Sequence, residues 1–338
     1  MERIPPHLAS HFVHGLATER RLRAALGPVE LQRLVDVGLL AWQPGRVLAY
    51  AGAGDPWTRL AAVQLRHPHV LGDGRLACWA HRIRPFATNE SPYLDVISAK
   101  HSPDPAVLWR RDLVTADVVS IASLWFTSPA RTLADLGDFT DPEAVERAVE
   151  SVLRTKIAGE AEIWAVARRL RRPGRHGPAV LGHILKRRGR GTPPTESDLE
   201  TRALQLIRRL GFPDPTWRQY PVERPGRAPF RVDFVWDTGR YLVFVEIDGD
   251  GTHTNPDALT SDLARQNYLH RSRPTLLRFS RHHVDFEPAH IATELGQHLY
   301  SAGANSTAAP EVTAPSSPRA EGSTSTAKNR AVATLAAR

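Results

Sequence analysis

A short segment that is apolar on both sides, residues 241–247, constrains the fold of this 338-residue chain more than any other feature. Successive side chains of an extended strand point to opposite faces of a sheet. Val243, Val245 and Ile247 fall on one side, and Leu242 and Phe244 on the other. A strand of this kind is normally central, with both faces covered. The surrounding sequence is therefore predicted to form a layered domain.

The residues around this strand predict a regular order of elements, α-β-β-β-α-β followed by a last helix. The pattern is that of an α/β domain over residues 194–300. Helices are expected over 197–210, 256–270 and 287–299, and strands over 217–222, 231–236, 241–248 and 275–279, with a tight turn at 237–240.

Three acidic residues converge on the apolar strand. Glu246 and Asp248 share one face by alternation, and Asp233 lies on the preceding strand. With the turn closed over 237–240, Asp233 is expected beside Phe244 and diagonal to Glu246. Buried carboxylates are costly without a compensating positive charge.

Two sources of that positive charge are open. A hard divalent cation such as Mg²⁺ takes oxygen ligands and keeps waters for chemistry. The alternative is an ion pair with a nearby arginine, such as Arg265 or Arg278.

The joint spacing of these residues resembles the Vsr-like branch of the PD-(D/E)XK nuclease superfamily, whose members are related to very-short-patch mismatch repair enzymes. The resemblance covers about residues 194–300. The matching residues are Ser197, Glu200, Val232-Asp233-Phe234, Val245-Glu246-Ile247-Asp248-Gly249, His253, Asp262, Arg265 and Leu277-Arg278-Phe279.

The resemblance implies a restriction-endonuclease-like core with a mixed sheet, and phosphodiester hydrolysis assisted by Mg²⁺ or Mn²⁺. It implies that Asp233 and Glu246 hold the metal. Asp248 stands where the superfamily usually has a lysine, so His253 is the expected replacement as base or phosphate contact. The predicted catalytic set is Asp233, Glu246, Asp248, His253 and Glu200, and Arg265 and Arg278 are predicted to contact DNA.

The first 55 residues have the outline of a winged helix, with helices over 5–14, 19–26 and 28–38 and a hairpin of strands 39–43 and 46–51. Thr18 is the expected N-cap of the second helix, and Gly27-Pro28 separates it from the third. The third helix would offer Glu30, Gln32 and Arg33 to a DNA groove, and Arg46 would lie on the wing. Small helical subdomains with hairpins also serve dimerisation.

Residues 56–190 are predicted to form an α+β region. Together with the winged-helix outline, the segment 128–136 (Ser-Pro-Ala-Arg-Thr-Leu-Ala-Asp-Leu) resembles proteins with an AbiEi-type antitoxin domain, which implies DNA binding and autorepression. Arg131 and Asp135 can form an ion pair at helical spacing.

The middle region ends in a basic segment that is predicted to be a hinge. Nine of its residues from 168 to 191 are Arg or Lys and none is acidic. They form either a solvated surface or a strip that follows a phosphate backbone.

Composition supports a partner of negative charge. The net charge is +8 and the isoelectric point about 10.1, which favours polyanions. Cys78 is the one cysteine, so an intrachain disulfide is impossible. Without a signal peptide or a membrane-spanning apolar run, the protein is predicted to be cytoplasmic. Residues 301–338 are predicted to be a disordered tail.

The sequence therefore favours a metal-dependent endodeoxyribonuclease with an N-terminal DNA-binding module. The alternative is a non-catalytic DNA-binding transcriptional regulator of the antitoxin class, with a degenerate nuclease fold. A third interpretation is a protein partner of a linked toxin. The oligomeric state is left open.

Overall fold

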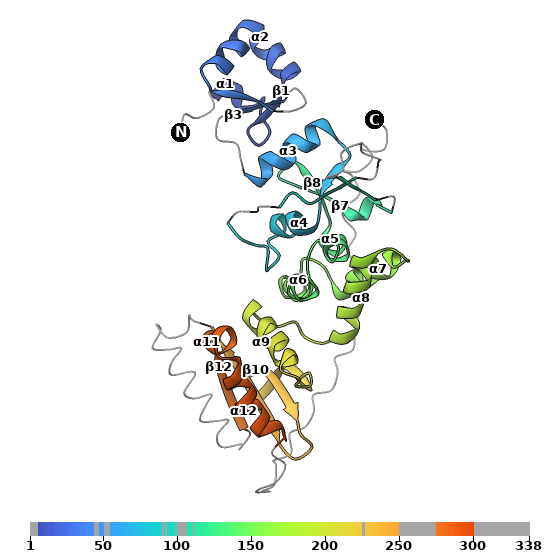
Figure 1. Ribbon diagram of the computed structural model, residues 1–338, viewed down its shortest axis with the longest axis vertical. Helices are drawn as coiled ribbons and strands as arrows, with labels where there is room; N and C mark the ends of the chain where they lie inside the picture. The colour runs from blue at the N-terminus through green and yellow to red at the C-terminus, as the bar shows by residue number, and fades with distance from the viewer. Residues whose placement is uncertain are drawn as a thin grey trace. The chain divides into compact units, whose positions relative to one another are not determined.

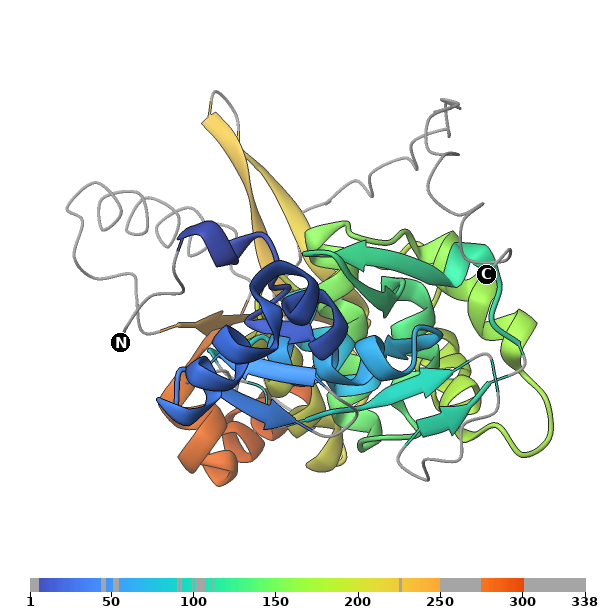
Figure 2. The same cartoon turned by 90° about the horizontal axis from the view of Figure 1, so that it is seen from above.

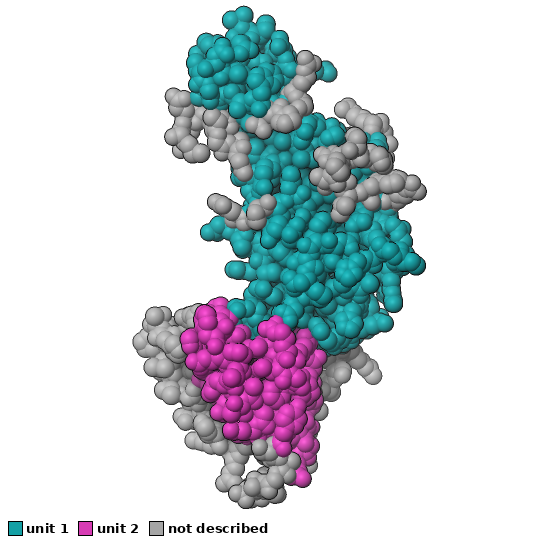
Figure 3. Space-filling model, viewed as in Figure 1, with its two compact units in different colours: residues 1–205 teal, residues 206–338 magenta. Residues whose placement is uncertain are grey.

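A computed structural model describes most of the chain before residue 301. The described residues are 6–43, 47–50, 55–89, 91, 93–98, 100, 107–110, 112–224, 227–249 and 275–300. The chain divides into two compact units, residues 1–205 and 206–338 (Figure 3). Within the described ranges no helix is both long and apolar enough to cross a bilayer. The predicted helix 256–270 and the predicted disordered tail lie outside the described residues, as do Arg46, His253 and Arg265.

Unit 1 begins with a small helical and β-stranded part. Its elements are α1 (Pro6–Ala9), β1 (Leu16–Thr18), α2 (Glu19–Asp36), β2 (Leu40–Gln43) and β3 (Val47–Tyr50) (Figure 1). The strands form an antiparallel sheet in the order β1-β3-β2. The first helix is shorter than the predicted 5–14, and β1 was not predicted.

A break in α2 separates the two helices that the sequence predicts there. Thr18 caps the first helix, accepting the Arg21 N–H at 3.3 Å, as expected. Gly27 then takes φ 75°, which glycine adopts without steric cost. Pro28 suits the first turn that follows because it has no N–H to leave unsatisfied. The two helices share one buried core, which consists of Leu8, Ala17, Leu22, Leu31, Leu34, Leu40 and Leu48.

The rest of unit 1 is a five-stranded mixed sheet followed by helices. The first part comprises α3 (Pro56–Arg66), β4 (Val70–Gly72), α4 (Gly74–Ala80), β5 (Val96–Ser98), β6 (Val107–Trp109), the 3₁₀ turn η1 (Thr115–Asp117), β7 (Val118–Ile121) and β8 (Leu124–Thr127). The strand order is β6-β5-β4-β8-β7. The helices that follow are α5 (Pro129–Leu136), α6 (Pro142–Thr155), α7 (Glu160–Leu170) and α8 (His176–Arg188).

Unit 2 is built on a four-stranded mixed sheet. The elements from residue 198 onward are α9 (Asp198–Arg209), β9 (Trp217–Arg224), β10 (Arg227–Asp237), β11 (Leu242–Asp248), β12 (Thr275–Ser280), α11 (Arg281–Phe286) and α12 (Pro288–Tyr300). The strand order β12-β11-β10-β9 places β11 inside the sheet, which confirms its predicted central position. β12 is parallel to β11, whereas the other neighbours are antiparallel. β10 starts four residues before the predicted strand, and α11 was not predicted.

The two faces of this sheet differ in character. Phe279, which pairs with Ile247 in the register, contacts the rings of His283 and His290 at 6.2 and 6.1 Å between centroids. Helices α11 and α12 therefore lie on the Ile247 face, next to β12 (Figure 1). Alternation places Glu246 on the opposite face, so the acidic residues point away from these helices.

Candidate active site

Asp233 and Glu246 each lie next to the last residue pair between two neighbouring strands, β10 and β11. The register pairs Val235 with Phe244 and ends at Phe234 with Val245, so Asp233 and Glu246 are the next residues beyond its last pair. The expectation that Asp233 lies beside Phe244, diagonal to Glu246, is therefore wrong by two residues.

The error arises from the turn between β10 and β11. Asp237 still pairs with Leu242, so the loop comprises residues 238–241 rather than 237–240. Thr238 closes this loop, because its hydroxyl donates to the Tyr241 carbonyl at 2.9 Å and its N–H donates to the same oxygen at 3.2 Å. The Asp237 carboxylate also accepts the Gly239 N–H at 2.8 Å.

The Asp233 carboxylate is fixed against the neighbouring strand. Its Oδ2 accepts the backbone N–H of Ile247 at 2.8 Å. Its Oδ1 lies 3.4 Å from the Gln219 amide nitrogen on β9. Contacts from both neighbouring strands therefore orient this partly buried side chain.

Glu246 is the more deeply buried of the two acids, with 4% of its surface exposed. The parallel register places Arg278 of β12 beside it, and Arg278 Nε lies 3.6 Å from Glu246 Oε2. Arg278 contacts Asp248 more closely, with Nε and Nη2 each 3.0 Å from a carboxylate oxygen. The ion-pair alternative involving Arg278 is thus confirmed, and Asp248 is its main partner.

The donor set fits a hard divalent cation. Asp233 and Glu246 supply two carboxylates next to the last β10–β11 pair, and Mg²⁺ is usually bound by one or two carboxylates together with water. The guanidinium of Arg278 beside Glu246 shows that this position favours a cation. Among the described residues, no group of three or more Asp, Glu, His or Cys side chains is arranged to hold a metal. Within this described part of the chain, a metal ion at the site would therefore have at most two protein side chains as ligands.

Gln219 is a site residue that the sequence did not reveal. The β9–β10 ladder pairs Val232 with Tyr220 and Phe234 with Arg218, so Gln219 lies opposite Asp233. It is buried and has φ 50°, a left-handed conformation that costs a non-glycine residue about 1–2 kcal/mol. Such strain concentrates at functional sites. No local sequence pattern marks it, because tertiary contacts impose the conformation.

Glu200, which was predicted to be catalytic, forms hydrogen bonds at the start of helix α9. Its Oε2 accepts the Glu196 N–H at 2.7 Å, and its own N–H donates to the Ser197 hydroxyl at 3.1 Å. These reciprocal bonds cap the start of α9. Glu200 belongs to unit 1, whereas Asp233 and Glu246 belong to unit 2. Its catalytic role stays a prediction.

The predicted DNA contacts on α2 are exposed but engaged with neighbouring acids. Arg33 Nε and Nη2 donate to the two oxygens of Glu30 at 2.8 and 2.7 Å. Gln32 donates to Asp36 at 2.8 Å. These contacts raise the pKa of Arg33, with the hydrogen bond to Glu30 as the main cause. Any DNA contact at Arg33 would compete with Glu30.

The basic segment of residues 168–191 lies within unit 1, and much of its charge is compensated there. Five of its nine basic residues form ion pairs with acids of the unit. These five are Arg169 with Asp117, Arg172 with Asp112, Arg175 with Asp112 and Asp135, Arg187 with Glu146, and Arg188 with Glu150. The ion pairs weaken the interpretation of this segment as a phosphate-binding strip.

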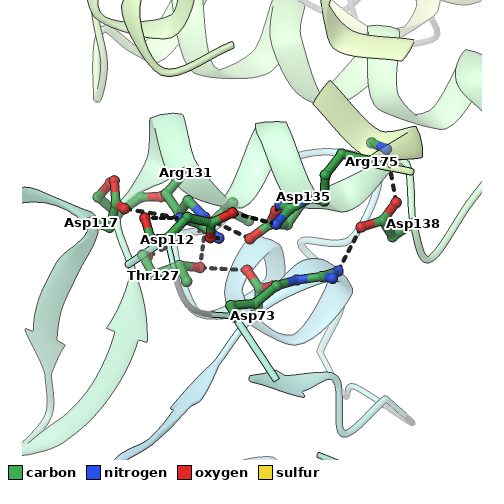
Figure 4. Close-up of polar contacts among 12 residues, drawn as sticks. Asp73, Asp112, Asp117, Thr127, Arg131, Asp135, Asp138 and Arg175 are labelled. Carbon is green, nitrogen blue, oxygen red and sulfur yellow. Dashed lines mark hydrogen bonds and ion pairs between the residues drawn. The ribbon is translucent and has the colours of Figure 1, made fainter. Parts of the chain in front are cut away.

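Three of these arginines belong to a buried network centred on Arg131 (Figure 4). The predicted pair of Arg131 and Asp135 is confirmed, with Nε and Oδ2 2.6 Å apart. Arg131 also contacts Asp112 at 2.8 Å and Asp117 at 3.0 Å, and its side chain is fully buried. The network thereby connects α5 to η1 and to the loop that follows α7.

Asp73 lies beside this network and is fully buried. Its Oδ1 accepts the Thr127 hydroxyl at 2.8 Å, and its Oδ2 has no hydrogen bond within the described part of the chain. Burial, and then the charge of Asp135, raise the pKa of Asp73 well above its usual range. Burial also raises the pKa of Asp135, but Arg131 and Arg175 oppose this shift. Within this group, burial favours the protonated form of Asp73 most strongly.

Comparisons with known proteins do not assign the chain to a family. No family model matches it, and a search of curated proteins finds no match. Inferences about function therefore depend on the residues and their geometry.

Proposed function

We propose that the chain is a metal-dependent DNA endonuclease with an N-terminal DNA-binding module. The observation that carries this proposal is the presence of two carboxylates, Asp233 and Glu246, next to the last residue pair of the adjacent strands β10 and β11. The resemblance of residues 194–300 to the Vsr-like branch supports the same assignment.

We also propose a restriction-endonuclease-like core for unit 2 and a winged helix for the start of unit 1. A helix, three strands and a parallel β12 match the order of a restriction-endonuclease-like core over the described residues. In unit 1, a kinked helix pair followed by an antiparallel hairpin is the order of a winged helix. Its second helical segment presents Gln32 and Arg33 to solvent, as a helix that enters a DNA groove requires.

The described residues have separate roles in this mechanism. Asp233 and Glu246 hold the metal, and the Ile247 N–H keeps the Asp233 carboxylate in position. When bound, Mg²⁺ or Mn²⁺ supplies Lewis acidity to the phosphate and lowers the pKa of a bound water. Arg278 is placed to exchange its contact with Asp248 for a phosphate oxygen, because arginine binds both groups in the same two-pronged geometry. His253 remains the proposed base.

Cleavage of DNA by the purified full-length chain tests this proposal. Single-stranded, duplex and mismatched substrates should be nicked or cut with Mg²⁺ or Mn²⁺ and left intact with EDTA. Glu246→Gln, which removes the charge and keeps the shape, should abolish cleavage. Glu294→Gln on α12 makes the same chemical change in the same unit and should cut like wild type. Equal inactivity of wild type and Glu246→Gln on all substrates would contradict the proposal.

A second candidate function is a non-catalytic transcriptional regulator. It is favoured by the ion pairs of Arg278 with Asp248 and Glu246, which offset part of the charge of the acidic cluster without a metal. This function predicts salt-sensitive binding to the chain's own promoter, weakened by Gln32→Ala/Arg33→Ala and retained by Glu246→Gln. Promoter binding without cleavage by wild type, under all metal conditions, would select this function over the first.

A further inference from the structure

Strands β9 and β10 extend beyond the rest of their sheet. Only Phe234–Asp237 of β10 pairs with β11, whereas the pairing with β9 continues to Arg227. Residues 220–224 and 227–232 therefore form a two-stranded arm, which Figure 2 shows as the long yellow hairpin.

The arm is basic. Between residues 220 and 232 it contains three arginines, Arg224, Arg227 and Arg231, and one acid, Glu223. The register pairs Arg224 with Arg227, so two basic residues occupy opposed positions along the arm. Arg231 is exposed. Three arginines against one acid leave a net charge of +2 over this segment, which is complementary to a phosphate backbone.

The arm also leads directly to the candidate active site. Asp233 follows its last residue, and Gln219, which contacts Asp233, precedes its first. At about 3.4 Å per residue, Arg231 lies roughly 7 Å and Arg227 roughly 20 Å along the strand from Asp233. Phe230 pairs with Val222 between these arginines, and both are partly buried. This apolar pair stiffens the arm.

We propose that the arm is a docking ribbon that lies in the major groove of duplex DNA. The major groove of B-DNA admits a two-stranded β-ribbon. In that position the arginines contact phosphates next to the bond that Asp233 and Glu246 address. The inference rests on the proposed nuclease function, because it takes the acidic pair as the reacting centre.

Salt-dependent binding of duplex DNA tests the arm. Binding is measured by fluorescence anisotropy at several salt concentrations, with full-length Glu246→Gln as the parent so that no substrate is consumed. Adding Arg224→Ala and Arg227→Ala should weaken binding. The slope of log K against log salt should become shallower by about 1.8, since each lost phosphate contact removes about 0.9. Arg224→Lys/Arg227→Lys should retain the parent slope, because lysine keeps the phosphate contact.

A matched control removes two charges elsewhere in unit 2. Arg209→Ala/Arg240→Ala changes exposed positions at the end of α9 and in the β10–β11 turn, and should leave the slope close to that of the parent. An arm variant with the parent slope would overturn the proposal. A control that changes the slope as much as the arm variant would overturn it too.

A crosslinking measurement covers the case in which the alanine variant does not fold. Cys78 is the chain's one cysteine and is buried, so Pro229→Cys introduces an exposed thiol on the arm. A photocrosslinker attached there should capture duplex DNA, whereas one at Arg240→Cys should not. Capture from position 240 but not from 229 would contradict the proposal.

The outcomes separate the arm from the nuclease assignment. If no variant cleaves DNA but the arm variants lose salt-dependent binding, the arm proposal stands and the nuclease proposal fails. If wild type cleaves DNA and the arm variants bind and cleave equally well, the arm proposal fails and the nuclease proposal stands.

Discussion

Replacing Arg131 with methionine should destabilise unit 1 more than any exposed charge substitution. The Arg131 guanidinium is fully buried and contacts the carboxylates of Asp112, Asp117 and Asp135. Methionine fills part of the same volume but carries no charge, so Arg131→Met removes the central cation. The buried acids then lose one of their partners.

The size of the loss in unfolding free energy depends on which arginines still contact the buried acids after the substitution. Removing one partner of a buried ion pair typically costs about 3–5 kcal/mol. Here each acid keeps another arginine, since Arg169 contacts Asp117 and Arg175 contacts both Asp112 and Asp135. We therefore expect a loss near the lower end, about 3 kcal/mol in the free energy of unfolding.

Urea unfolding followed by tryptophan fluorescence measures this loss. Six of the eight tryptophans precede residue 206, so the signal reports mainly on unit 1. With a urea slope of about 2 kcal/mol per molar, the midpoint should fall by about 1.5 M. Arg23→Met is the control, because Arg23 is exposed and ion pairs at this helical spacing contribute about 0.3–0.5 kcal/mol. Equal shifts for the two variants would refute the reasoning.

Three further predictions concern single side chains. Burial raises the folded-state pKa of Asp73, so wild type loses stability as pH rises from about 4 towards that pKa. Asp73→Asn has no such titration, so its free energy of unfolding should rise relative to wild type by up to about 1.4 kcal/mol per pH unit over this range. Unfolding measured at several pH values checks this, and a difference that does not change with pH would contradict it. Glu30→Gln should tighten duplex binding in anisotropy titrations because it releases Arg33 from its acidic partner; weaker binding would argue against DNA contact at this helix. Lys156 ends α6 at φ 57°, so Lys156→Gly should raise the thermal midpoint, with a gain of up to about 1 kcal/mol, and a lower midpoint would contradict this.

The sequence predicts those elements whose signals are local. β11 was predicted because both of its faces are apolar, and the break in α2 because Gly27-Pro28 cannot continue a helix. The pair of Arg131 and Asp135 was predicted because residues four apart share a helix face. Each of these signals lies within a few consecutive residues.

What the sequence did not predict depends on contacts between distant segments. The register of β10 and β11 was misplaced because Thr238 and Asp237, through their side-chain bonds, decide which residues form the turn. Gln219 was missed because its left-handed backbone and its contact with Asp233 on another strand have no local sequence signal. The acids that surround Arg131 come from segments outside its own helix, so helical spacing revealed only one of them.

Binding of Mn²⁺ at the acidic pair tests the central claim most directly. Crystals of the full chain soaked in Mn²⁺ are measured at a wavelength where manganese scatters anomalously, beside crystals of Glu246→Gln treated in the same way. The account predicts an anomalous peak between Asp233 and Glu246 in wild type and its loss in the variant. Wild-type crystals with no peak there, and with Arg278 still paired to Asp248 and Glu246, would contradict it.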